Sequence, residues 1–249
     1  MSQSGYGRIR LFNDFCGPEI PVANAVAYGT SAGGCNYYLG DFAVKGDLGE
    51  TDTGVVALGI TSGAVRISGN NEDGKGVALS TDLVFSPALN GTIAVEARVQ
   101  AQALTTRSIF VGLCGTIADD VAEPLTSTTV THTLTATNLC GFVLDSQLTA
   151  AAVWHAVYNG GSTTGATAST TTTTGVTAVA AEWDVLRLEV DNNGTARYYI
   201  NGVLESTVVG AVSTTALQGA LVGCWGTTTT AADLDVDYFA VEANRDWTR

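Results

Sequence analysis

Positive charge is scarce in this sequence. The chain carries 11 Lys plus Arg, with lysine only at Lys45 and Lys75, against 24 Asp plus Glu, and its formal net charge is -13. Nucleic-acid binding depends on clustered cations that contact phosphates, whereas only Arg8 and Arg10 lie close together here. We therefore expect no nucleic-acid partner. An acidic chain of this kind suits solubility, or docking onto a basic or neutral protein surface.

Long apolar runs and helical periodicity are also missing. No segment approaches the ~18 consecutive apolar residues of a membrane span, and no stretch repeats apolar residues at helical spacing. The beginning, MSQSGYGRIRLF, has neither the apolar region nor the cleavage site of a signal peptide. We expect no membrane contact, almost no helix, and synthesis in a reducing cytoplasm.

Motifs for common catalytic and metal chemistry are absent. The histidines, His132 and His155, stand in neither an HExxH nor an HxH spacing, and no GxSxG, GxGxxG or Walker loop occurs. The cysteines are odd in number and widely spaced, so we expect buried apolar residues rather than disulfides. They are Cys16, Cys35, Cys114, Cys140 and Cys224. The sequence predicts no cofactor, no metal and no catalytic residue.

Strand signals, by contrast, are strong, above all in residues 183–206, WDVLRLEVDNNGTARYYINGVLES. Apolar and polar residues alternate there with period two, which predicts strands with one buried face. Two steps, Asn193-Gly194 and Asn201-Gly202, divide the stretch into three strands, and each can form a type I′ hairpin turn. The inward residues should be Leu186, Leu188, Val190, Ala196, Tyr198 and Ile200.

Similar segments recur from about residue 41 to the end of the chain. Many strands at short spacing, separated by Asn- and Gly-rich turn signals, favour packed antiparallel sheets over βαβ units. The expected strands are 42–45, 54–60, 64–68, 76–79, 92–101, 108–114, 140–145, 153–158, 220–225 and 234–242, besides those of residues 183–206. The prediction is an all-β, two-sheet antiparallel sandwich domain in residues 41–249.

Two segments differ from this pattern. Residues 1–40 are rich in turn formers and lack periodicity, which indicates an extended N-terminal arm, although the apolar Phe12 and Phe15 leave a first strand open. Residues 162–177 hold nine threonines and no charge. They predict either a flexible loop or an exposed β-edge that contacts another subunit.

The order of segments from Thr92 onward resembles the concanavalin A-like lectin/glucanase superfamily. The matching pieces are TIAVEARV from Thr92, IFVGL from Ile109, GFVL from Gly141, YINGV from Tyr199 and LDVDYFAV from Leu234. The stretch NDFCG from Asn13 also resembles the opening of such domains. This resemblance implies a jelly-roll sandwich and is nearly silent on function.

β-Glucanases of this superfamily carry two glutamates and an aspartate on one strand, as ExDxxE or ExDxE, and that motif is absent. Asp233, Asp235 and Asp237 share a strand face by their spacing, but without a glutamate we interpret them as a solvated ladder that protects a sheet edge. A second acidic cluster offers too few oxygen ligands for calcium. It consists of Asp119, Asp120 and Glu123. We predict that the chain is not an enzyme.

The Gly-, Ala- and Thr-rich, acidic and lysine-poor composition resembles virion proteins of tailed bacteriophages. That resemblance implies a virion structural protein made in the host cytoplasm, and most of all a capsid decoration protein. Such a protein would bind the major capsid protein and assemble into a homo-oligomer, with a trimer favoured. The expected partner-binding residues are Tyr6, Arg8, Arg10 and Phe12.

A carbohydrate-binding module of the same fold, which a virion could also display, is the alternative function. Tryptophans stack on sugar rings in lectins, although each of them is more often a core residue. The candidates for contact with a surface glycan are Trp154, Trp183, Trp225 and Trp247. A glycoside hydrolase ranks third.

Overall fold

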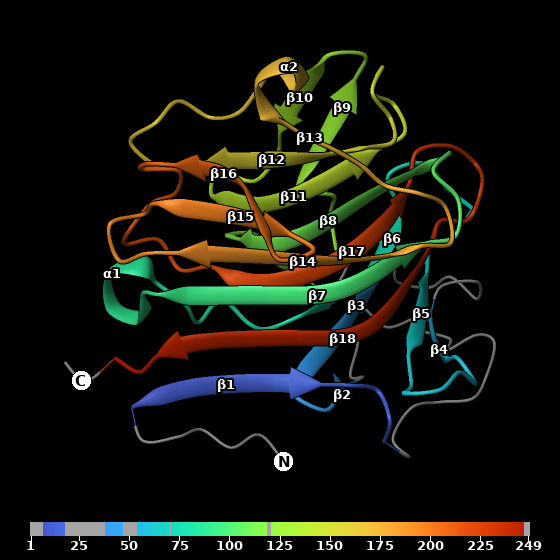
Figure 1. Ribbon diagram of the computed structural model, residues 1–249, viewed down its shortest axis with the longest axis horizontal. Coiled ribbons are helices and arrows are strands. Elements are labelled where there is room, and N and C mark those ends of the chain that lie inside the picture. Colours follow the sequence, from blue (N-terminus) through green and yellow to red (C-terminus); the bar gives the residue numbers. More distant parts are fainter. Residues whose placement is uncertain (1–6, 18–37, 47–53, 70, 119–120, 247–249) are drawn as a thin grey trace.

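The computed structural model describes residues 7–17, 38–46, 54–69, 71–118 and 121–246. These residues form two large antiparallel sheets packed face to face, together with a separate hairpin and two short helices (Figure 1). The predicted all-β, two-sheet antiparallel sandwich is confirmed.

Sheet A has eight strands, and its last strand in the sequence is central. In spatial order its strands are β16 (Val203–Val208), β15 (Ala196–Ile200), β14 (Trp183–Val190), β7 (Ile93–Ala101), β18 (Asp233–Asn244), β5 (Val65–Ser68) and β4 (Gly54–Ala57), while β1 (Arg8–Asn13) pairs with β18 beyond the end of β5. A β-bulge interrupts β18 between Val236 and Tyr238. The bulge shifts the alternation, so that Leu234 and Val236 face inward before it and Phe239 and Val241 after it.

Sheet B also has eight strands. In spatial order they are β13 (Thr173–Thr177), β12 (Val153–Asn159), β11 (Leu139–Asp145), β8 (Arg107–Cys114), β17 (Gly219–Gly226), β6 (Gly76–Ser80), β3 (Phe42–Gly46) and β2 (Tyr38–Leu39). The separate hairpin pairs β9 (Leu125–Thr128) with β10 (Thr131–Leu134), and the helices are α1 (Pro87–Asn90) and α2 (Ser169–Thr172). Among the described residues, no helix is long and apolar enough to cross a membrane.

The meander of β14, β15 and β16 forms where the alternation predicts it. All six predicted inward residues are buried, with Tyr198 and Ile200 at most 2% exposed. The second turn has positive φ at both Asn201 and Gly202, as a type I′ turn requires. The prediction of the same turn at Asn193-Gly194 is wrong. There only Gly194 has positive φ, because the Asn193 side chain accepts a hydrogen bond from the Thr195 amide at 3.0 Å within a longer loop.

The main core lies between the two sheets and is rich in aromatic side chains. The Phe142 and Tyr198 rings meet edge to face at 5.4 Å between centroids, a favourable arrangement for aromatic pairs. The buried Tyr198 hydroxyl donates to Val157 O at 2.9 Å, so its polar group is satisfied. Three cysteines are buried and free, as predicted, whereas Cys16 is exposed and Cys35 lies outside the described residues; the buried ones are Cys114, Cys140 and Cys224.

Both unusual segments contribute strands to the sandwich. From the N-terminal segment, β1 pairs with the C-terminal half of β18, and Phe15 is buried, so the first-strand alternative holds for residues 8–13. Residues 18–37 lie outside the described part of the chain. The threonine-rich segment forms α2 and then the edge strand β13, which pairs with β12. Contact of this edge with another subunit stays a prediction.

We expect Gly112→Ala to destabilise the sandwich. A Cβ at Gly112 would lie 2.2 Å from Cys140 O and 2.5 Å from Gly141 Cα, and these backbone atoms of β11 can move only if β8 and β11 separate. The cost should be about 1–3 kcal/mol or more in urea unfolding. Gly59→Ala is the matched control, because nothing lies within 4 Å of a Cβ there. Equal stability of the two variants would contradict this pairing of β8 with β11.

Candidate functional site

The outer face of sheet A carries an ordered array of charged and aromatic side chains. Strands β1, β18, β7, β14 and β15 lie side by side in that order (Figure 1). Their register sets the outward side chains in two rows that run across the strands. The first row is Phe12, Ala240, Glu96, Arg187 and Tyr199, and the second is Arg10, Glu242, Ala94, Glu189 and Arg197.

Small side chains open a groove in this array, which we call the sheet-A groove. Ala240 lies between Phe12 and Glu96 in the first row, and Ala94 lies beside Glu242 in the second. A larger residue at either alanine would fill the floor. The groove has a volume of about 1130 Å³ and is lined by Arg10, Leu11, Phe12, Asn13, Asp14, Gly17, Gly40, Asp41, Ala94, Glu96, Arg187, Tyr238, Ala240 and Glu242.

The arginines of the groove are paired with carboxylates. Arg10 Nε donates to Glu242 Oε1 at 2.7 Å. Arg187 donates to Glu96 Oε2 at 2.9 Å and to Glu189 Oε1 at 2.8 Å. These side chains are partly exposed, so each pair adds at most about 1 kcal/mol to stability. Their main effect is to hold the charged groups in fixed positions around the groove.

Tyr238 links the aromatic and charged parts of the groove. Its hydroxyl donates to Glu96 Oε1 at 2.8 Å, and its ring lies 6.1 Å from the Phe12 ring between centroids. Burial, and then the hydrogen bond to Glu96, raise the pKa of Tyr238 above its usual range. The phenol therefore stays protonated and orients Glu96, while the two rings present apolar surface beside Ala240.

The predicted partner-binding residues fall partly on this surface. Arg10 and Phe12 line the groove, and Arg8 is exposed on the same side of β1, whereas Tyr6 lies outside the described residues. The sequence did not indicate the other charged and aromatic groups of the groove described above, Glu96, Arg187, Tyr238 and Glu242. The alternation within each strand marks most of these residues as outward, but it carries no information on which strands become neighbours.

The outer face of sheet B, in contrast, is covered by the chain itself. Residues 121–136, which include the β9–β10 hairpin, pack there against a second hydrophobic cluster that contains Phe110 and Trp225. The indole of Trp225 donates to Val121 O at 3.0 Å. We call residues 121–136 the sheet-B cover.

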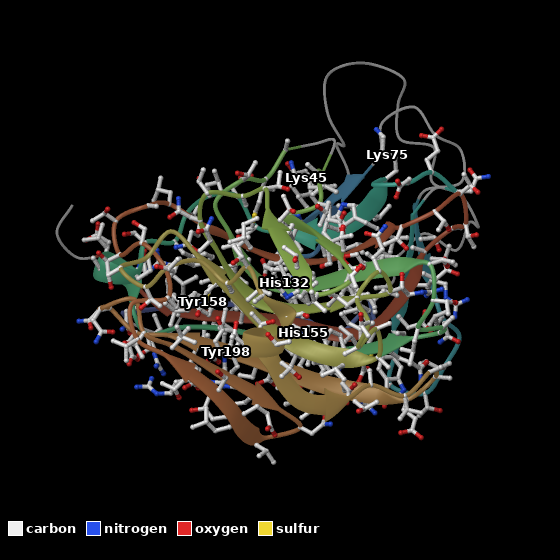
Figure 2. The ribbon with its side chains drawn as sticks, turned by 90° about the horizontal axis from the view of Figure 1, so that it is seen from above. Lys45, Lys75, His132, His155, Tyr158 and Tyr198 are labelled. Carbon is white, nitrogen blue, oxygen red and sulfur yellow. The ribbon has the colours of Figure 1, made fainter. Side chains whose placement is uncertain are left out.

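Both histidines are buried where the cover packs on sheet B: His132 belongs to β10 of the cover and His155 to β12 of the sheet, and the two lie side by side in Figure 2. Thr172 Oγ1 lies 3.0 Å from His132 Nε2 and 3.0 Å from His155 Nδ1, and it donates to Ser169 O. A hydroxyl has one proton, so both ring nitrogens must donate to Thr172. His132 Nδ1 then accepts from Ser127 Oγ at 3.1 Å, which is the pattern of a neutral imidazole.

The surroundings of the histidines favour their neutral form. Burial, and then the neighbouring His155, lower the pKa of His132 to about 4, and burial also lowers the pKa of His155. Both nitrogens of His132 and Nδ1 of His155 are hydrogen-bonded to the hydroxyls of Ser127 and Thr172, which differs from the carboxylate-oriented histidine of a Ser-His-Asp triad. The interpretation of His155 as a strand residue is confirmed, since it lies within β12.

The interpretation of Asp233, Asp235 and Asp237 as a solvated ladder at a sheet edge is wrong. They lie on β18, which is central because three strands pair with it. Asp235 is 2% exposed and accepts two hydrogen bonds from Arg66, at 2.7 and 3.0 Å. Asp237 falls at the bulge and pairs with Arg98. Asp235 and Asp237 therefore bind arginines within the sheet.

Of the second acidic cluster, the structure describes Glu123. Asp119 and Asp120 lie outside the described residues. Glu123 belongs to the sheet-B cover. Burial there raises the pKa of Glu123 to about 8. A hydrogen bond with Ser108 opposes this shift, and the charge of Asp145 adds to it. Among the described residues, no group of three or more His, Cys, Asp or Glu side chains could hold a metal ion.

The candidate sugar-stacking tryptophans are divided between the core and the surface. Trp154 and Trp225 are at most 1% exposed, and Trp247 lies outside the described residues. Trp183 is half-buried at the start of β14, and the Arg98 guanidinium stacks 4.8 Å from its ring centroid. Of the described tryptophans, Trp183 is the one with an accessible ring.

Comparison with known proteins identifies the fold. No protein-family model matches the sequence, and no curated protein does. The chain is similar to SO2946, a protein of unknown function from Shewanella oneidensis MR-1, with a TM-score of 0.58 and 11% identity over 100% of this chain and 92% of that one. It is similar to LamA from Z. galactanivorans in complex with laminaritriose and laminaritetraose (TM-score 0.51, 12% identity, 74% of this chain and 79% of that one).

A further similar structure is an endo-β-1,4-glucuronan lyase from the fungus Trichoderma reesei (TM-score 0.52, 11% identity, 88% of this chain and 94% of that one). Together these structures show that the chain has a concanavalin A-like jelly-roll fold. At such identities the similarity concerns the fold.

The prediction that the chain is not an enzyme is contradicted by this comparison. Most of the similar structures are enzymes of the same fold, the glucuronan lyase among them. The prediction was based on the absence of the glucanase motif and of the other common catalytic motifs. That inference fails, because one fold can support different chemistries with different residues.

The Glu123 carboxyl group, whose Oε1 is buried, should make stability depend on pH. Its pKa is raised from 4.5 to about 8, so between these values the folded protein holds a proton that the unfolded chain releases. The contribution of Glu123 is therefore greatest below about pH 4.5 and is lost as pH rises toward 8. Glu123→Gln should exceed the wild type in free energy of unfolding at pH 9 by more than about 1 kcal/mol, and should differ little at pH 4.5.

Urea unfolding across this pH range is the measurement, with the exposed Glu182→Gln as a control for net charge. If Glu123→Gln and Glu182→Gln showed the same pH dependence, Glu123 would not be buried as described.

Proposed function

We propose that this protein binds a carbohydrate in the sheet-A groove. The observation that carries the proposal is the hollow at Ala240, which has the rings of Phe12 and Tyr238 beside it and fixed carboxylates and guanidinium groups around it. Binding sites generally combine apolar surface with a few fixed polar groups in a concave region. A sugar needs both, because its ring faces are apolar and its hydroxyls form hydrogen bonds.

The groups around the hollow can form hydrogen bonds with sugar hydroxyls. A carboxylate can accept about four hydrogen bonds, and Glu96 accepts one from Tyr238 and one from Arg187. Glu96 can therefore accept hydrogen bonds from sugar hydroxyls without losing these contacts. The LamA structure, which holds laminaritriose and laminaritetraose, supports the choice of ligand class.

Binding to a glycan array, followed by calorimetric titration of the positive oligosaccharides, tests this proposal. Ala240→Trp fills the floor of the groove and should weaken binding by about 10-fold or more, equivalent to ~1.4 kcal/mol. Val203→Ala, on the far edge strand β16 where Val203 is 58% exposed, should leave the affinity unchanged.

Circular dichroism and a thermal melt would show that Ala240→Trp remains folded. The absence of any oligosaccharide hit, or full affinity in Ala240→Trp, would contradict carbohydrate binding in this groove.

A second proposal is the narrower role of a capsid decoration protein that binds the major capsid protein of a bacteriophage as a homo-oligomer. Its support is β1, a strand that pairs with β18 and presents Arg8, Arg10 and Phe12 on its exposed side. A surface of this kind suits contact with another protein chain. The role does not conflict with carbohydrate binding, since a virion can display a sugar-binding domain.

Co-sedimentation with undecorated capsid particles tests the second proposal. We expect the full chain to bind and Arg8→Glu to bind more weakly, because the arginine would face the shell. Thr207→Glu adds a negative charge on β16 at the opposite edge of sheet A and should bind as the wild type does. Failure of the full chain to bind any particle would refute decoration.

A further inference from the structure

The charged residues that line the sheet-A groove indicate which saccharides it accepts. Its lining contains two arginines, Arg10 and Arg187, and four carboxylates, those of Asp14, Asp41, Glu96 and Glu242; no lysine is among the lining residues. Both arginines form ion pairs with carboxylates of the protein. The lining as a whole is therefore acidic, on a chain whose net charge is -13.

Because of these ion pairs, neither lining arginine is free to bind the carboxylate of an anionic sugar. A uronic-acid carboxylate would need a guanidinium group, yet Arg10 is engaged by Glu242 at 2.7 Å, and Arg187 by Glu96 at 2.9 Å and Glu189 at 2.8 Å. To contact either arginine it would displace a protein carboxylate or lie beside one. Like charges at such distances repel, and repulsion of this kind excludes one ligand in favour of another.

A neutral sugar carries no charge that the carboxylates of the groove would repel. Its hydroxyls can donate to carboxylates that remain paired with arginine, because a carboxylate oxygen accepts more than one hydrogen bond. Tyr238 and Arg187 hold the two oxygens of Glu96 in place from different strands, β18 and β14. The acceptors are thus fixed before the ligand binds, which reduces the entropy lost on binding.

We infer that the sheet-A groove selects neutral saccharides over uronic-acid saccharides, and that the pairs Arg10–Glu242 and Arg187–Glu96 determine this selectivity. The inference rests on the proposed carbohydrate-binding function. Arg10–Glu242 is the pair to alter, because Glu242 lies beside Ala94 and opposite Arg10 at the β1 end of the groove. Its removal leaves the Tyr238–Glu96–Arg187 group intact.

The test compares oligosaccharides that differ only in charge. Cellotetraose and a β-1,4-linked tetraglucuronate share a backbone and differ at C6, and each hit of the glycan array is likewise paired with its uronic-acid counterpart. Calorimetric titration of the wild type should show about 10-fold or greater preference for the neutral member of a pair that binds.

Glu242→Gln keeps the shape of the side chain and releases Arg10 from its ion pair. We expect this variant to gain about 10-fold in affinity for the uronic-acid ligand, with a smaller change for the neutral one. Asp191→Asn is the matched control. It removes the same charge and releases Arg197 on the same sheet face, but neither residue lines the groove, so the selectivity should not change.

The outcomes separate this inference from the function on which it rests. A wild-type protein that binds uronic-acid ligands more tightly, or a Glu242→Gln variant with unchanged selectivity, would overturn the inference and leave carbohydrate binding intact. An equal gain in Asp191→Asn would assign the effect to net charge and would also overturn it. No binding to any saccharide would refute the proposed function itself.

Discussion

The pairing of β18 with β7 is the contact on which both the fold and the candidate site depend. β18 pairs with β7 along most of its length. On its other edge, β18 pairs first with β5 and then with β1. The bulge between Val236 and Tyr238 changes which side chains face outward. Without it, Tyr238, Ala240 and Glu242 would point into the core, and Phe239 and Val241 would lie on the surface. A single extra residue thus places the floor of the groove on the outer face.

The strands themselves could be predicted because the signal for each of them is local. Alternation of apolar and polar residues identified β14 and β15 and their inward side chains, and the Asn201-Gly202 turn followed from backbone chemistry. The Asn193-Gly194 turn was predicted wrongly, because a side-chain hydrogen bond to Thr195 in a longer loop overrides the dipeptide preference. The β9–β10 hairpin was missed because its short threonine- and histidine-containing strands have few apolar residues to show a period.

The candidate site could not be predicted, because it exists only through long-range pairing. Arg10 and Glu242 are 232 residues apart in the sequence, and nothing local indicates that β1 lies beside β18. The change of phase in LDVDYFAVEA is visible in the sequence, with Leu234 and Val236 before it and Phe239 and Val241 after it. Taking β18 as one regular edge strand concealed this change, and it also produced the wrong interpretation of Asp233, Asp235 and Asp237.

The two outer faces of the sandwich differ in how far their ionisable groups are exposed to water. Where the sheet-B cover packs on its sheet, ionisable groups have little water, so His132 of the cover remains neutral and Glu123 of the cover retains its proton near neutral pH. On the outer face of sheet A, Arg10 and Arg187 lie beside the carboxylates of Glu242 and Glu96, and both partners of each pair reach water. A cover that buries neutral groups gains stability from close packing, whereas an open array of paired charges keeps hydrogen-bonding capacity for a ligand. The position of the groove on sheet A follows from this difference, since the chain has already used the face of sheet B for its own packing.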